Sequence, residues 1–331
     1  MKPSWSRILF LLMSGLTLAS PVFAAASQDK YDLPEPYISS EKAYLKELPD
    51  LQRVMDVMVG ASERQLKEPG QDVLHNRVCA ALVYQMSVDN KLPSSERRLA
   101  LAGDLLHNIS KEEQDSILTR ADQMAKADHM IARLKHAGYF TKSPNFWSDS
   151  AVFGNPKIGG NRALIHHITG AVMAGELLQE LGRFSEQEIS TVEAAIVEHS
   201  TGYWYFRTSV NDIVGKSDAW EKVYPEPESN IAKFTHDADL ISQFVPESVV
   251  PDGSKWRLLA KKRWGAKTTQ EEGHIVYYVF LRLFEEAKTN SGKEMARQQW
   301  DLIAPALVKL MGLKPGDDPI KLMGIPRVFS K

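Results

Sequence analysis

The stretch at residues 99–111, LALAGDLLHNISK, constrains the fold most strongly. Its apolar residues recur at helical spacing and predict an amphipathic helix that ends in the polar pair His107 and Asn108. An imidazole beside a short amide at the end of an apolar helix is an unusual use of core space. The pair makes sense if His107 is one ligand of a metal ion whose other ligands come from other helices.

Candidate partners for His107 lie on other predicted helices. His75, His166 and His199 each fall near one end of an apolar-faced helix, and an acidic run occupies residues 237–239. One such histidine is more often a packed residue or a helix cap than a ligand. Several of them with a carboxylate favour a site for a divalent transition ion, which helical bundles build from facing helices.

The remaining sequence predicts an all-α fold, because strand signals are weak and no repeat is evident. Helices are expected at residues 51–59, 73–88, 94–108, 111–135, 161–181, 185–199, 229–244, 269–287 and 293–311. Turns or caps are expected at Pro69-Gly70, Asp72, Gly182 and the Ser185/Glu188 capping box. Two long connections, at 139–160 and 201–227, are rich in aromatic residues.

The first 24 residues have the features of a secretory signal peptide. Lys2 and Arg7 precede an apolar run at 8–18, and a small-x-small cleavage motif ends at Ala24. An uncleaved anchor is the alternative, and no later stretch approaches the roughly 20 apolar residues that a membrane span needs. We therefore expect a periplasmic or secreted protein.

The net charge and the cysteine content of the chain argue against a nucleic-acid-binding protein and against a disulfide-stabilised one. A formal net charge of -2 argues against nucleic-acid binding through a basic surface. Cys79 is the single cysteine, so no internal disulfide can form. Because Cys79 falls on a mostly apolar helix, it is predicted to be a buried, inert thiol.

Five sequence elements resemble, in order, the metal-binding elements of HD-domain metal-dependent phosphohydrolases. LLHNISK at 105–111 is similar to the family signature LLHDIGK, and His75 with the residues after it resembles the first metal histidine. The run at 166–171 has the family's Gly-Ala four residues after a histidine. AIVEHSTG at 195–202 resembles the fourth element, especially as seen in six-ligand bacterial members that cleave dinucleoside polyphosphates. ADL at 238–240 matches the closing element.

The resemblance spans residues 70–245 and implies an HD-domain-like helical bundle. Residues 25–69 would form an N-terminal arm with a short helix, and residues 246–331 a C-terminal helical extension. One or two divalent transition ions (manganese, iron, zinc, cobalt or nickel) are implied as cofactors. The implied metal ligands are His75, His107, Asn108, His166, His199 and Asp239.

One residue departs from the family pattern, because Asn108 replaces the aspartate of the His-Asp pair. A carboxamide offers one neutral oxygen and no charge, so it bridges two cations poorly. Weaker occupancy by two ions, a single ion, or binding without turnover is therefore expected. Asp104, one helical turn earlier, can supply part of the missing charge, although a purely structural Asp104 is the alternative.

The resemblance also suggests residues that act on a substrate. Lys111 matches the family's lysine after the pair and can contact a phosphate, or it is only a surface lysine. His167 either supports a ligand or packs in the core. Trp147 and Tyr203, in the aromatic connections, either stack on a nucleobase or anchor their loops.

The implied reaction is hydrolysis of a phosphoester or phosphoanhydride of a nucleotide or related small molecule. A catalytically weakened domain that binds metal and a phosphorylated ligand, as a sensor or scaffold, is the main alternative. A helical protein whose histidines are coincidental is the third hypothesis. The C-terminal helices can pack on the core or form a homodimer, and both options stay open.

Overall fold

The computed structural model describes residues 31–35, 37–65, 69–110, 120–201, 203–244 and 246–330. The predicted all-α fold is confirmed, since the described residues form helices and contain no strand. Two compact units are present, Leu33–Asp239 and a second unit that includes Leu240–Lys331. The predicted signal peptide lies outside the described residues.

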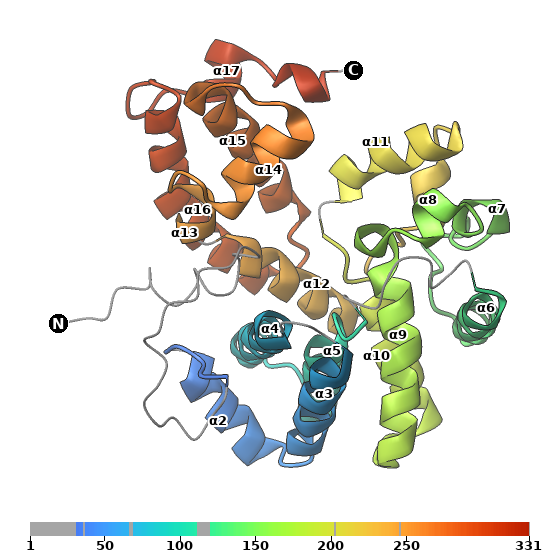
Figure 1. The fold of residues 1–331 in the computed structure, drawn as a ribbon. Helices are drawn as coiled ribbons and strands as arrows, with labels where there is room; N and C mark the ends of the chain where they lie inside the picture. The colour runs from blue at the N-terminus through green and yellow to red at the C-terminus, as the bar shows by residue number, and fades with distance from the viewer. Residues whose placement is uncertain are drawn as a thin grey trace. The chain divides into compact units, whose positions relative to one another are not determined.

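The unit Leu33–Asp239 is built from a series of helices (Figure 1). They are α2 (Tyr37–Glu47), α3 (Leu51–Gln65), α4 (Pro69–Asp89), α5 (Ser94–Leu106), α6 (Ala121–His136), α7 (Ser150–Phe153), α8 (Pro156–Gly159), α9 (Arg162–Leu181), α10 (Glu186–Val197), α11 (Tyr203–Val214), η2 (Ala219–Lys222) and α12 (Asn230–Gln243), the last up to Asp239. This unit includes α2 and α3, which pack against α4.

Helix α5 lies at the centre of this unit. It packs against α3, α4, α9 and α10, and every residue from Leu99 to Leu106 is buried. The helix predicted to be amphipathic is therefore buried on all sides over its second half, as expected of a helix enclosed by others. Its polar end, including Asp104, is consequently forced into the core.

Local signals at helix ends account for the hairpin of α9 and α10, which lie side by side (Figure 1). Gly182 ends α9 in the left-handed conformation at φ 59°, which glycine adopts without strain. Ser185 and Glu188 form both bonds of the predicted capping box at the start of α10. Both predictions are confirmed.

Four local predictions are wrong. Helix α4 begins at Pro69, so Pro69-Gly70 is not a turn before it and Asp72 lies in its first turn rather than at its N-cap. Proline is favoured in a first turn because its missing N–H would be unpaired there. The connection at 201–227 contains α11 and η2, and the connection at 139–160 contains the short helices α7 and α8.

The C-terminal unit is also helical. It contains the end of α12, α13 (Pro246–Val249), α14 (Lys255–Trp264), α15 (Thr269–Glu286), α16 (Asn290–Leu310), α17 (Pro319–Met323) and η3 (Arg327–Phe329). Its core includes Phe280, whose ring centroid lies 5.0 Å from those of Phe244 and Trp256. A buried ion pair joins Arg257 of α14 to Glu272 of α15 at 2.7 Å.

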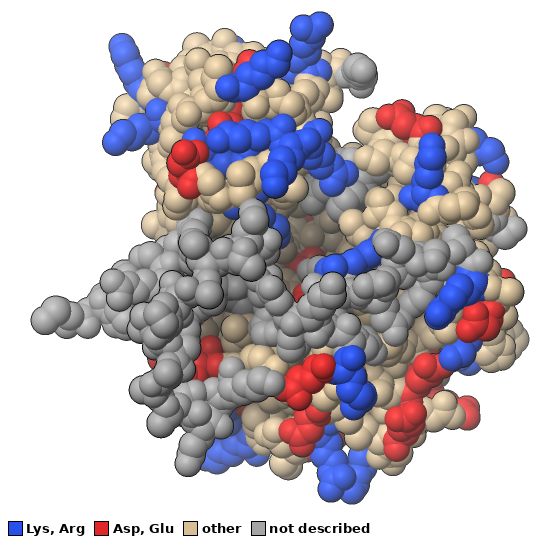
Figure 2. Space-filling model, in the orientation of Figure 1, with Lys and Arg blue, Asp and Glu red and all other residues tan. Residues whose placement is uncertain are grey.

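Charges on the visible face of Leu33–Asp239 are mixed. Acidic and basic side chains are interspersed over the lower part of the view in Figure 2, which belongs to this unit. Among the described helices, none has the length and apolar character needed to cross a bilayer.

A close contact between α9 and the end of α5 yields a testable prediction. A Cβ on Gly170 would lie 2.9 Å from the backbone oxygen of His107, and a backbone carbonyl cannot move aside as a flexible side chain can. Gly170→Ala should therefore destabilise the protein by about 1–3 kcal/mol in urea unfolding. Gly60→Ala in α3, where the nearest atom is the end of Arg64 at 3.4 Å, is the control and should not destabilise. Equal loss of stability in both variants would contradict the prediction.

Candidate metal centre

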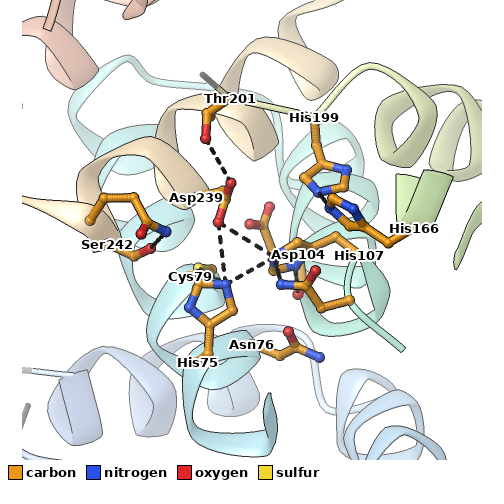
Figure 3. Close-up of polar contacts among 12 residues, drawn as sticks. His75, Asn76, Cys79, Asp104, His107, His166, His199, Thr201, Asp239 and Ser242 are labelled. Carbon is orange, nitrogen blue, oxygen red and sulfur yellow. Dashed lines mark hydrogen bonds and ion pairs between the residues drawn. The ribbon is translucent and has the colours of Figure 1, made fainter. Parts of the chain in front are cut away.

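Four residues from the unit Leu33–Asp239 bring possible metal ligands together (Figure 3). They are His75, Cys79, His107 and Asp239, and one ligand atom from each lies within 4.8 Å of all the others. The two histidine Nε2 atoms are 3.2 Å apart. Asp239 Oδ1 lies 3.3 Å from Nε2 of His75 and 4.0 Å from Nε2 of His107. This group can hold a metal ion.

The helices explain why these side chains meet. His75 and Cys79 are four residues apart on α4, so they share one face of that helix. His107 is the C-cap residue of α5, which packs along α4. Asp239 comes from the later part of α12. Residues distant in sequence thus converge, because α4 and α5 pack together and Asp239 of α12 lies next to the C-terminal end of α5.

Cys79 was predicted to be an inert buried thiol, and the structure places it among the possible ligands instead. It is wholly buried, and its Sγ lies 3.7 Å from Nε2 and 3.9 Å from Nδ1 of His75. The i, i+4 spacing of a histidine and a cysteine on one helix was the signal available in the sequence. The resemblance offered no cysteine at this position, so the thiol was missed.

A second pair of histidines adjoins the first group. His166 of α9 and His199, just after α10, have their Nε2 atoms 3.2 Å apart. The ring of His199 stands edge-on to that of His107, with centroids 4.9 Å apart. The structure therefore brings together His75, His107, His166, His199 and Asp239, all of which the sequence analysis predicts as ligands.

Backbone carbonyls orient two of these imidazoles in the same way. Nδ1 of His107 donates to the carbonyl of Asp104 at 2.7 Å, and Nδ1 of His199 donates to the carbonyl of Ile196 at 2.6 Å. Each bond places the proton on Nδ1 and leaves the Nε2 lone pair for the cluster. Metal-binding histidines are commonly held by this arrangement.

Asp239 is kept ionised by its surroundings. Burial raises its pKa, but the hydrogen bond and charge of His75, with His107 and His199 nearby, outweigh burial and hold that pKa well below the usual range. The Thr201 hydroxyl donates to Oδ2 at 3.0 Å, which leaves Oδ1 facing the histidines. His75 and Asp239 retain 12% and 14% side-chain exposure, so solvent can reach the cluster on their side.

Asp104 is a second carboxyl group beside the cluster. It is wholly buried, and neither of its oxygens has a hydrogen-bond partner among the described residues. The Thr235 hydroxyl, its neighbour, donates to Ile231 at 3.2 Å. Burial, with the charge of Asp239, raises the pKa of Asp104 well above its usual range. The nearby Thr235 hydroxyl, as a potential donor to the carboxylate, acts to lower this pKa but is outweighed. A buried carboxyl group in this state indicates a place that a cation would stabilise.

Asn108 faces the same cluster. Its Nδ2 lies 2.7 Å from His107 Nε2, while its buried Oδ1 has no partner in the described part of the chain. A half-turn of the amide would present that oxygen as a neutral ligand. Asn108 is thus placed where the resemblance puts a ligand, but it brings no negative charge.

His167 lies away from the cluster. Its Nε2 donates to the carbonyl of Val223 at 2.6 Å, and its ring stacks on Tyr224 at a centroid distance of 5.1 Å. Burial lowers the pKa of His167 to about 3, so the ring is neutral. These contacts give His167 a packing role and leave His166 as the member of the pair that faces the cluster.

The other predicted substrate residues divide into two groups. Trp147 donates its indole N–H to Asp128 at 2.6 Å and packs against Phe153, with ring centroids 3.8 Å apart and planes tilted by 33°. These contacts anchor a loop. Lys111 lies outside the described residues, and so does the side chain of Tyr203. Their predicted roles stay predictions.

The donor set fits a divalent ion. Imidazole nitrogens, a carboxylate and a thiol are ligands that transition ions accept, and the unpartnered Asp104 supports a nearby positive charge. Comparisons with protein-family models, with curated proteins and with solved structures yield no match to this chain. The site is therefore defined by its geometry alone.

Metal binding should stabilise the fold, because the ion would neutralise charge that folding buries. Adding a transition ion at about 100 times its Kd to chelator-treated protein should raise the free energy of unfolding by about 2.7 kcal/mol. The measurement is thermal or urea unfolding with and without the ion. His107→Ala should lose this stabilisation, and His136→Ala, at an exposed position, should keep it. An equal response of the two variants would contradict the site.

Proposed function

We propose that this chain is an HD-domain-like, metal-dependent phosphohydrolase. Its substrate would be a phosphoester or phosphoanhydride of a nucleotide or related small molecule. The supporting observation is that His107, at the end of the central helix, meets His75, Asp239 and His199 from three other segments. These are the residues that the resemblance to the family selects from the sequence.

The proposed chemistry follows from the ligand set. A divalent ion bound there supplies positive charge that activates water and polarises a phosphoryl oxygen. The imidazoles of His107 and His199 are held in one orientation by backbone carbonyls, so they need no rearrangement to bind. His75 and Asp239 line the partly exposed side, where a small anionic substrate can approach.

Asp104 has a defined part in this proposal. Because Asn108 is uncharged, the cluster lacks one negative charge that the family supplies at that position. The Asp104 carboxyl group points toward that of Asp239 in Figure 3, and its oxygens are not used by hydrogen bonds among the described residues. Asp104 would restore that charge beside the ion. Lys111, which follows the pair in sequence, would contact the phosphate.

Manganese, iron, zinc, cobalt and nickel are all compatible with imidazole and carboxylate ligands. In this proposal one ion binds at His75, His107 and Asp239, and a second binds at the His166/His199 pair. We also propose export to the periplasm or the exterior, on the basis of the predicted signal peptide. Envelope processes or nutrient scavenging would then provide the substrate.

A catalytically weakened domain is the second candidate, and Asn108 is the observation that favours it. Nδ2 of Asn108 donates toward His107 Nε2, the atom that would bind an ion. The amide must turn before Asn108 can add a ligand, and even then it adds no charge. Such a domain would bind an ion and a phosphorylated ligand without turnover.

Hydrolysis should depend on Asp239. The protein, supplied with manganese, cobalt or zinc, should release product from a panel of phosphodiesters, phosphomonoesters and nucleotides. Asp239→Asn should lower kcat/KM by at least about 100-fold, because even residues that merely support a metal ligand often cost 10–100-fold. Asp212→Asn, at an exposed position of α11, should retain activity. Metal binding without hydrolysis of any substrate would favour the weakened domain.

Asn108→Asp separates the two candidates further. A carboxylate at this position can bridge two ions, so the variant should bind more metal per chain, measured by elemental analysis. If the natural protein is a weakened domain, the variant should gain hydrolytic activity. If the natural protein is an efficient hydrolase, the activity of the variant should stay within about tenfold of it, a change of about 1.4 kcal/mol in the barrier.

A further inference from the structure

The sulfur of Cys79 has a place in the metal centre that the resemblance does not supply. An ion bound tetrahedrally at about 2.0–2.1 Å from nitrogen or oxygen and about 2.3 Å from sulfur separates its ligands by about 3.3–3.6 Å. The sulfur lies 3.7 Å from His75 Nε2, which itself is 3.2 Å from His107 Nε2 and 3.3 Å from Asp239 Oδ1. The three distances from His75 Nε2 to the other ligand atoms are therefore close to those between the ligands of a tetrahedral ion.

We propose that Cys79 binds the ion as a thiolate and completes a four-ligand site with His75, His107 and Asp239. The site would select a thiophilic divalent ion, zinc or cobalt, over manganese or magnesium. The proposal deepens the proposed function, since it names the ion class of the same centre, and it rests on that function for the role of the ion in hydrolysis. Thiolate ligation itself can be tested without activity.

The position of the thiol supports this assignment. Cys79 is wholly buried one turn after His75, so both side chains leave α4 in the same direction. A thiol buried among apolar groups stays protonated, whereas a nearby cation favours the thiolate. Binding an ion would therefore release a proton from Cys79.

Asp104 provides an independent sign that a cation belongs here. Its carboxyl group is wholly buried beside Asp239, and its oxygens have no partner among the residues described. A buried carboxyl group whose oxygens make no hydrogen bond is costly. A divalent ion beside Asp104 and Asp239 would offset that cost.

Selectivity follows from ligand chemistry. Soft thiolate ligands favour zinc and similar ions, whereas manganese and magnesium prefer sites made of oxygen. Four protein ligands also fill a tetrahedron, which is typical of a tightly held structural ion, so water activation would fall to a second ion beside it. The adjacent pair His166 and His199 offers only two imidazoles, so an ion there would keep positions for water and substrate.

Cobalt titration of the metal-free protein is the direct test, because Cys79 is the single cysteine of the chain. A cobalt–thiolate bond produces a charge-transfer absorption in the near ultraviolet, and here only Cys79 can cause it. We expect this absorption to grow until one cobalt is bound at the site. Cobalt binding without the absorption would overturn the proposal.

Variants extend the test. Cys79→Ser should lose the absorption and bind zinc at least about tenfold more weakly, with manganese affinity little changed. His136→Ala, at an exposed position, should keep both properties, and circular dichroism should show that both variants are folded. If Cys79→Ser does not fold, the cobalt spectrum of the natural protein still decides. Unchanged zinc affinity in a folded Cys79→Ser variant would contradict thiolate ligation.

The two proposals fail separately. A thiolate absorption in a protein that hydrolyses no phosphoester would leave the metal site as proposed and would exclude the hydrolase. Hydrolysis with cobalt but without the absorption would support the hydrolase and exclude Cys79 as a ligand.

Discussion

The burial of the polar end of α5 is the constraint on which the site depends. Leu99–Leu106 are enclosed on all sides, so His107 and Asn108 follow directly into the core, and Asp104 is carried in with them. A buried polar group without a partner costs about 1–3 kcal/mol. The oxygens of Asp104 and Asn108 lack partners in the described structure, and a bound cation would offset their cost.

The surrounding helices place possible metal ligands next to the buried polar end of α5. Helix α4 brings His75 and Cys79 to the end of α5, while α9 and α10 bring His166 and His199. Gly170 lets α9 approach the carbonyl of His107 more closely than any side chain would permit. The same packing that stabilises the bundle therefore concentrates the ligands at one point.

Local features were predictable from the sequence, because they depend on neighbouring residues. The capping box of Ser185 and Glu188 and the glycine at 182 lie where they were expected. Helix α11 was missed, because the aromatic residues of its first turn have only moderate helix propensity. The positions of the histidines near the ends of apolar helices predicted that they converge, and the resemblance added which of them would bind the metal. The position of Cys79 beside His107 could not be predicted from the sequence. Periodicity shows which face of a helix is apolar, but it does not show which faces of distant helices meet.

Crystals soaked with zinc test the central claim most directly, by anomalous scattering at the zinc absorption edge. A strong peak should lie within bonding distance of His75 Nε2, Cys79 Sγ, His107 Nε2 and Asp239 Oδ1, about 2.0–2.3 Å from each. A zinc-saturated protein with no peak among these four atoms would contradict a metal centre at the end of α5.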